Sequence, residues 1–515
     1  MAALFFARAG LVRMTRPLAD YFAASRLVPA LFNAVAIAAS AMAVLVFVGG
    51  AGAIDFAWQG MLVLLLGAGV GLVLAGLLIA PYLRGFGGYT LPDFLAERFN
   101  AETMRPLGVF AVILCSFPAL AAVLLGFGLL GQATLALPVW IGITAGAVFI
   151  LVATLLGGMR SLSLSQLAYY VVMLLAGLVA IGTVIWQTGS IAAFDSLLVD
   201  EVIPSLPWQL FAQTSPINSL ALFFCLATGF AALPFLLMRS FTAPDMVDAR
   251  LSFLGAPIFL LLLCAALPAL AALYEPAALA VGDVLSMIAQ AVLVVAAVSA
   301  LLATGAALCL SMASTIAHDL YFKSAAPNAP VSRQLLVARL SVVLLAALAG
   351  AAALLRPEET VLAAATALSL AASTLLPVLV LGIWWKRLGS DAAVAGMVAG
   401  LLVCLYYMIV PHLIPIVFYE SSSLFSDATA AQAASFEGLR LEYYAANGEA
   451  AQAAALAEWQ AAVRPIANWF GVQGSLAAVF AVPVGFLVTL VVGLFTSSPS
   501  ARRQRFFDNL RTKPV

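Results

Sequence analysis

Long apolar segments alternate with short polar connections along almost the whole chain. A helix needs about 20 apolar residues to cross the hydrocarbon core of a bilayer, so each such segment predicts one spanning helix. Twelve segments meet this length: 30–53, 57–83, 106–131, 135–157, 163–186, 217–238, 251–274, 284–317, 334–355, 360–384, 392–418 and 471–496. The pattern predicts an all-α polytopic membrane protein with about 12 transmembrane helices.

The positions of Lys and Arg give these spans a direction. If the loops are assigned to alternate sides, one side receives all of the 23 basic residues except Arg356, Arg440 and Arg464. Because cytoplasmic loops are enriched in Lys and Arg, we expect both termini to be cytoplasmic and the chain to be a multi-pass protein of the inner membrane. Helices 1 to 5 and 6 to 10 then run in opposite directions, as an inverted-repeat (5+5) transporter requires.

The same pattern divides the chain into eight segments. These are a cytoplasmic N-terminal segment (1–28), a first five-helix repeat (29–187), an external loop (188–216), a second five-helix repeat (217–385), helix 11 (386–418), an external Ala-rich segment (419–469), helix 12 (470–496) and a basic cytoplasmic tail (497–515). Within the Ala-rich segment, residues 431–463 have a helical composition. We therefore expect a helix or a helical hairpin on the external surface.

Composition and charge exclude several classes of protein. Only 9% of the residues are charged and the mean hydropathy is +1.12, whereas soluble domains carry about 25% charged residues. The formal net charge is zero, which leaves no overall positive field for nucleic acid. No cluster of His, Asp and Glu falls at membrane depth, so we do not expect an enzyme. The expected partners are the lipid bilayer and a small-molecule solute.

The polar residues inside the predicted spans are neutral. The hydroxyl and amide groups are those of Asn33, Ser40, Gln166, Tyr169, Thr228, Ser299, Thr304, Ser311, Ser314, Thr366, Ser369, Ser373 and Thr374. Hydroxyls and backbone carbonyls are ligands for hard cations, although helix packing is the more common role of a Ser or Thr in a membrane helix. By this assignment no buried Arg is available to pair with a substrate carboxylate.

Helices 6 and 8 have features that a plain spanning helix lacks. Helix 6 contains the sequence ATGFAALP, in which Gly229 and Pro234 bracket the middle of the span. Proline removes a backbone donor and frees carbonyls for a ligand or an ion; a kink without a binding role is the alternative. Helix 8 is longer than a bilayer requires and ends at His318 and Asp319. We expect Asp319 to cap or anchor that end.

Seven segments in order along the chain are similar to one family. They are DYFAASRLVPALFNAVAIAAS, YTLPDFLAERF, LLGGMRSLSLSQLAYYVV, FLLMRSFTAPDMVDAR, ASTIAHDLYFK, LPVLVLGIWWKR and FGVQGSLAAVFAVPVGFLVTLVV. Together they resemble the sodium:solute symporters, specifically the acetate-permease-like (cation/acetate symporter) branch. The resemblance implies an inverted-repeat fold of five plus five helices, a central substrate cavity, and a sodium ion held between helices 1 and 8.

At the positions that match the family's sodium site on helix 8, most of the side chains that would bind sodium are replaced by alanine. The family carries a Ser followed by a Ser or Thr, and these positions fall on Ala303 and Thr304, with Ala300 one turn earlier. Only one hydroxyl therefore remains at the metal site that the resemblance implies.

Other positions depart from the pattern in the same direction. On helix 1 the Asp of this branch falls on Ser40 and a Ser falls on Ala43. Where the family has a Gln on helix 3, this chain has Val123. Where some relatives have a further acidic residue on helix 8, this chain has Ala306. Since affinity for a hard cation depends on the number and charge of its oxygen ligands, we expect sodium binding to be weak or lost. Transport would then be uncoupled, proton-linked or driven by another gradient.

The function that the resemblance implies is secondary active transport of a small organic solute, a monocarboxylate such as acetate, by alternating access. The candidate substrate-binding residues are Ser40, Val123, Gln166, Thr228 and Gly229. No organic cofactor is expected, Na⁺ is the candidate coupling ion, and a small membrane subunit is a further candidate partner. The alternative is a transport-deficient paralogue that acts as a membrane sensor or accessory subunit.

Overall fold

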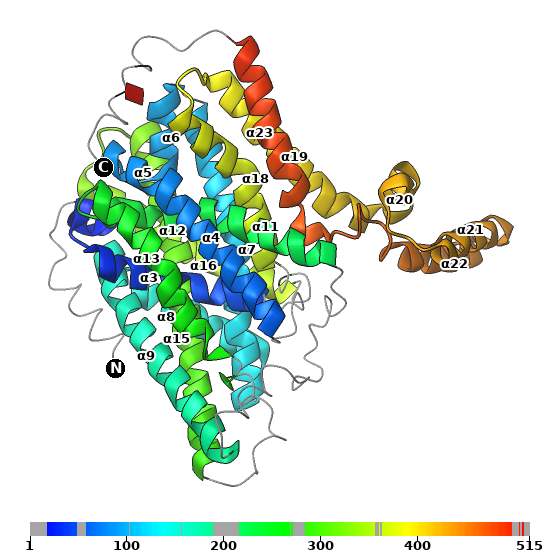
Figure 1. The fold of residues 1–515 in the computed structure, drawn as a ribbon, viewed down its shortest axis with the longest axis horizontal. Coiled ribbons are helices and arrows are strands. Elements are labelled where there is room, and N and C mark those ends of the chain that lie inside the picture. The colour runs from blue at the N-terminus through cyan, green and yellow to red at the C-terminus, as the bar shows by residue number, and fades with distance from the viewer. Residues whose placement is uncertain are drawn as a thin grey trace.

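The chain forms a bundle of long helices from which one helical hairpin projects (Figure 1). This computed structural model describes residues 18–48, 58–101, 103–155, 157–188, 216–267, 269–270, 284–355, 360, 363–496, 504, 507 and 508. Within those residues every named element is a helix and no strand is found. The predicted all-α class is therefore confirmed.

The helices of the bundle coincide with the predicted spans. They are α3 (Ala30–Val48), α4 (Trp58–Leu78) with α5 (Ala80–Phe86), α7 (Met104–Leu135), α8 (Val139–Leu155), α9 (Gly158–Thr188), α11 (Pro216–Ala232), α13 (Met246–Cys264), α15 (Val284–Thr315), α16 (Val331–Leu355), α18 (Ala363–Trp384), α19 (Ser390–Leu413) and α23 (Ala478–Phe495). In the described part of the chain, 10 helices are long and apolar enough to cross a membrane, one bent pair brings the number to 11, and α8 is a shorter apolar helix. The chain is thus a multi-pass membrane protein.

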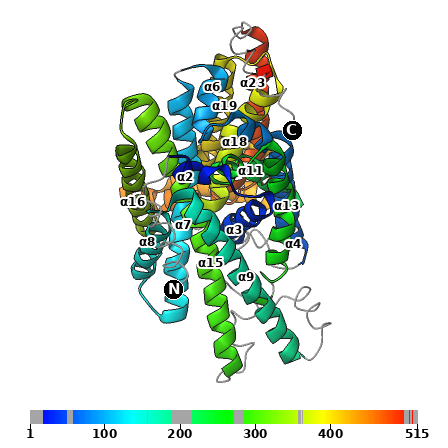
Figure 2. The same ribbon diagram turned by 90° about the vertical axis from the view of Figure 1, so that its left-hand side faces the viewer.

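The contacts between helices have the symmetry of an inverted repeat. If each helix of the first five is exchanged with its counterpart in the second five, α3 corresponds to α11, α4 to α13, α7 to α15, α8 to α16 and α9 to α18. Three contacts of one set then have a counterpart in the other. The α3–α13 contact corresponds to α11–α4, the α9–α15 contact to α18–α7, and the α7–α16 contact to α15–α8. All six contacts are present. Figure 2 shows α9 and α15 lying side by side. This matched set of contacts is what two oppositely oriented repeats produce.

Helix 6 is broken where the sequence predicted it. α11 ends at Ala232, and α12 (Pro234–Leu237) begins at the proline with a bend of 41°. The chain continues as the 3₁₀ helix η4 (Met238–Thr242), and both α12 and η4 contact α3. The break therefore turns the end of helix 6 toward helix 1.

Helix 8 extends beyond the bilayer-spanning length. α15 continues as the π-helix η5 (Ile316–Ala325), which makes an apolar helix of 35 residues from Ala291 to Ala325. η5 contacts α7, and α7 contacts the short helix α6 (Leu91–Phe99). Thr90 precedes α6 and caps it, because its hydroxyl accepts a hydrogen bond from the Asp93 amide. These elements bring two distant parts of the sequence together at one end of the bundle.

The Ala-rich segment forms the predicted hairpin. After α20 (Pro415–Ser422), α21 (Ala430–Ala445) and α22 (Glu449–Val463) pack on each other. A capping box between Thr429 and Gln432 starts α21, and the rings of Phe436 and Trp459 lie 5.3 Å apart between the two helices. The hairpin extends sideways from the bundle in Figure 1.

Candidate functional site

Helices 1 and 8 meet directly at the position that the resemblance assigns to sodium. The Thr304 hydroxyl of α15 donates a hydrogen bond to the Ser40 carbonyl of α3 at 2.7 Å, and it accepts one from the Ala43 amide at 3.3 Å. All three residues are buried. The single hydroxyl left on helix 8 therefore connects the two helices directly.

Gln166 of α9 adds helix 5 to this junction. Its side-chain amide nitrogen donates to the Ser40 hydroxyl at 2.6 Å and to the Ala303 carbonyl at 3.0 Å. The Ser40 hydroxyl in turn donates to the Ala36 carbonyl of its own helix at 2.6 Å. One buried amide thus joins helices 1, 5 and 8, and four of the predicted site residues come together here.

An arginine completes the network, contrary to the sequence-based expectation. Arg239 of η4 is 0% exposed, and its guanidinium donates to the Ser163 hydroxyl at 2.8 Å and to the Gln166 side-chain carbonyl. The Arg239 backbone carbonyl accepts a hydrogen bond from the Asn33 side chain of α3 at 3.0 Å. The expectation that no buried Arg is available was wrong, because the bend at Pro234 folds this part of the predicted cytoplasmic loop against helix 1.

Among the described residues, the hydrogen-bond partners of the Arg239 guanidinium are neutral. Its two terminal nitrogens bond a hydroxyl and an amide, while its Nε is buried without a hydrogen-bond partner. Removing an ion from water costs several kcal/mol in proteins unless an opposite charge compensates it. The site is therefore electrostatically suited to an anion.

The remaining predicted site residues lie at helix contacts. Val123 is buried next to Gly305, where an added Cβ would lie 3.1 Å from the valine. The Thr228 hydroxyl bonds the Phe224 carbonyl of its own helix at 2.7 Å. Gly229 packs against Leu368 of α18, which an added Cβ would approach to 2.7 Å. Ala300 is buried one turn before the Thr304 junction.

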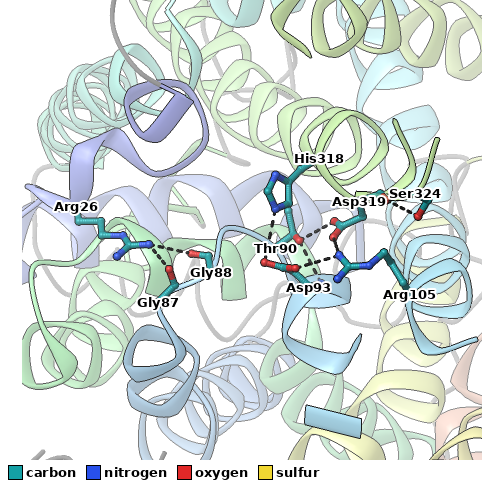
Figure 3. Close-up of polar contacts among 9 residues, drawn as sticks. All are labelled: Arg26, Gly87, Gly88, Thr90, Asp93, Arg105, His318, Asp319 and Ser324. Atoms are coloured by element: carbon teal, nitrogen blue, oxygen red, sulfur yellow. Dashed lines mark hydrogen bonds and ion pairs between the residues drawn. The ribbon is translucent and has the colours of Figure 1, made fainter. Parts of the chain in front are cut away.

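A second polar cluster lies where α6, α7 and η5 meet (Figure 3). Thr90 donates to Asp319 at 2.6 Å, and Arg105 pairs with Asp319 at 2.8 Å and with Asp93 at 3.0 Å. Asp319 therefore anchors the end of helix 8, as the sequence predicted. The partners were not predictable from sequence, because Asp93 and Arg105 lie more than 200 residues before Asp319.

Comparisons with known proteins agree with this architecture. The family model described as the sodium:solute symporter family matches residues 21–400. An uncharacterised symporter of Cupriavidus necator is 26% identical over an alignment of 671 positions that covers 98% of this chain and 92% of that protein. The structure of a Na⁺-coupled sialic acid symporter, in a substrate-bound outward-open state, is similar in fold with a TM-score of 0.63 and 14% identity, covering 97% of this chain and 98% of that one. The chain belongs to the sodium:solute symporter family and is a multi-pass secondary transporter.

Proposed function

We propose that this transporter carries a small monocarboxylate, such as acetate, across the inner membrane by alternating access. The observation that supports this most strongly is Arg239, a fully buried guanidinium whose described partners are neutral. Its planar donors match the two oxygens of a carboxylate, and charged hydrogen bonds of this kind are about twice as strong as neutral ones. A substrate carboxylate would supply the opposite charge.

The location of Arg239 also fits a transport site. Through Gln166 the guanidinium is linked to Ser40 on helix 1 and to Ala303 on helix 8. In inverted-repeat transporters, substrates bind between the two repeats near broken helices. An anion bound at Arg239 would therefore act on the contacts that join the first repeat to the second.

We further propose that sodium binding at the junction of helices 1 and 8 is weak or lost. Thr304 supplies one hydroxyl, which is already bonded to helix 1. The Gln166 amide directs hydrogen atoms at Ser40 and Ala303, and a donor group repels a cation. Arg239 adds a fixed positive charge to the same network. Coupling to protons or to another gradient, or uncoupled transport, would follow.

Uptake by proteoliposomes tests both proposals. The purified full chain would be reconstituted and given labelled acetate, pyruvate or a neutral sugar, in sodium buffer and in choline buffer. We expect saturable uptake of the monocarboxylates and equal rates in the two buffers. A steep rise of acetate uptake with sodium would contradict the loss of coupling. A well-folded chain that takes up none of the carboxylates would contradict the transport proposal and would favour the sensor alternative.

A further inference from the structure

The end of the bundle where α6 and η5 meet holds three metal-ligating side chains that the proposed transport does not use. One ligand atom each of Asp93, His318 and Asp319 lies within 4.8 Å of the other two. The residues are 5%, 5% and 0% exposed, respectively. Buried carboxylates and an imidazole at such short separations form a set of oxygen and nitrogen ligands.

His318 is the group whose surroundings are incomplete. Its Nδ1 has no hydrogen-bond partner among the described residues, and its Nε2 lies at ion-pair distance from Asp93 without forming a standard hydrogen bond, although buried polar atoms are normally hydrogen-bonded. Nε2 lies 3.5 Å from the Asp93 carboxylate. The rings of Phe22, Tyr89 and Phe322 surround the imidazole with centroids at 5.8, 5.3 and 6.0 Å. These rings hold the imidazole in place, and Figure 3 shows its contact with the Asp93 carboxylate.

Each carboxylate has one oxygen that is not held by Arg105. The guanidinium pairs with Oδ1 of Asp93 and Oδ1 of Asp319. Oδ2 of Asp93 faces His318, and Oδ2 of Asp319 accepts a hydrogen bond from Thr90. Arg105 therefore occupies one oxygen of each carboxylate, and a cation beside the imidazole would replace the contacts that the other two oxygens make with His318 and Thr90.

We propose that Asp93, His318 and Asp319 form a binding site for a divalent transition metal, and that Zn²⁺ fits it best. Two ligands about 2.1 Å from a tetrahedral zinc lie about 3.4 Å apart, and the distance from His318 Nε2 to Asp93 Oδ2 is 3.5 Å. Asp319 would supply the third ligand, since one of its oxygens lies within 4.8 Å of the other two ligand atoms. Water or the Thr90 hydroxyl would take the fourth position.

The consequence of metal binding follows from the elements that the site joins. Asp93 lies in α6, between helices 2 and 3 of the first repeat, whereas His318 and Asp319 lie in η5, at the end of helix 8 of the second. Alternating access requires the elements of the two repeats to move against each other. Zinc that bridges α6 and η5 would therefore stabilise one conformation and inhibit transport, whichever solute is carried.

Zinc titration of the purified full chain tests the proposal. Isothermal titration calorimetry should show one zinc ion bound tightly per chain. The variants His318→Asn and Asp93→Asn should have a zinc affinity at least about tenfold lower. His412→Asn is the matched control, because His412 is the other histidine of the chain and lies exposed on α19. Arg105→Gln removes a competing cation and should tighten binding.

Two further measurements keep the test independent of folding. Gel filtration shows whether each variant remains monodisperse, and thermal unfolding of the wild type with and without zinc reports binding in the unaltered chain. We expect zinc to raise the unfolding temperature of the wild type and of His412→Asn, but not that of His318→Asn. Equal zinc affinity in the wild type and His318→Asn would overturn the proposal, as would loss of binding in His412→Asn.

Discussion

The guanidinium of Arg239 donates a hydrogen bond to the side-chain carbonyl of Gln166, and this contact joins the broken end of helix 6 to helix 5. The amide of the same Gln166 reaches Ser40 and Ala303. A fixed positive charge is therefore two hydrogen bonds away from the junction of helices 1 and 8. The predictions below follow from that arrangement and from the packing around it.

Replacing Arg239 should impair transport of carboxylates specifically. Arg239→Gln keeps a side chain that can bond Ser163 and Gln166 but removes the charge, so we expect the KM for acetate to rise about tenfold or more, since each 1.4 kcal/mol of lost binding is a factor of ten. Arg239→Lys should retain part of the activity. Arg387→Gln, at an exposed arginine, is the control. Unchanged acetate kinetics in Arg239→Gln would exclude this role.

Thr304→Ala should affect stability more than ion dependence. The variant loses the hydrogen bonds that the hydroxyl makes with Ser40 and Ala43, each worth about 0.5–1.5 kcal/mol. We expect a lower unfolding temperature in detergent and the same ratio of uptake in sodium and choline as in the wild type. A wild type whose uptake depends on sodium, together with a variant that has lost this dependence, would show that Thr304 binds the ion.

Ser40→Asp should reduce acetate uptake. The substitution places a carboxylate beside the Gln166 amide, one side chain away from Arg239, where it would compete with the substrate for the positive charge. Ser40→Asn has a similar shape without the charge and should reduce uptake less. If both variants reduce uptake equally, the effect is steric and the electrostatic explanation fails.

Gly229→Ala should destabilise the contact between α11 and α18. An added Cβ would lie 2.7 Å from Leu368, and overpacking of this kind costs about 1–3 kcal/mol. Gly438→Ala in α21 is the matched control, since nothing lies within 4 Å of the added Cβ, and it should leave the unfolding temperature unchanged or slightly higher. Equal stability of the Gly229→Ala variant would mean that α11 and α18 can separate at little cost.

The fold was largely predictable because it depends on local sequence properties. Apolar length alone identified the helices of the bundle, Pro234 marked the break in helix 6, and the Ala-rich composition predicted the hairpin of α21 and α22. Each of these features is set by residues close together in the chain. The family resemblance was likewise carried by contiguous segments, and the matched family model confirms the sodium:solute symporter family.

The site was less predictable because its contacts join distant residues. Ser40, Gln166 and Thr304 were selected as polar residues inside predicted spans, and Ala303 was selected by resemblance. The structure brings the four together. Arg239 was missed because a basic residue after an apolar span is normally assigned to a cytoplasmic loop. The apolar residues between Pro234 and Arg239 were the available signal that the arginine remains within the bundle.

The most direct test of the account compares acetate with its neutral analogue acetamide in binding to the purified transporter. Both have nearly the same shape, but only acetate can pair its charge with Arg239. Calorimetry should detect binding of acetate and not of acetamide to the wild type, and of neither to Arg239→Gln. Acetate binding of equal affinity in the wild type and in Arg239→Gln would contradict the claim that Arg239 recognises the substrate.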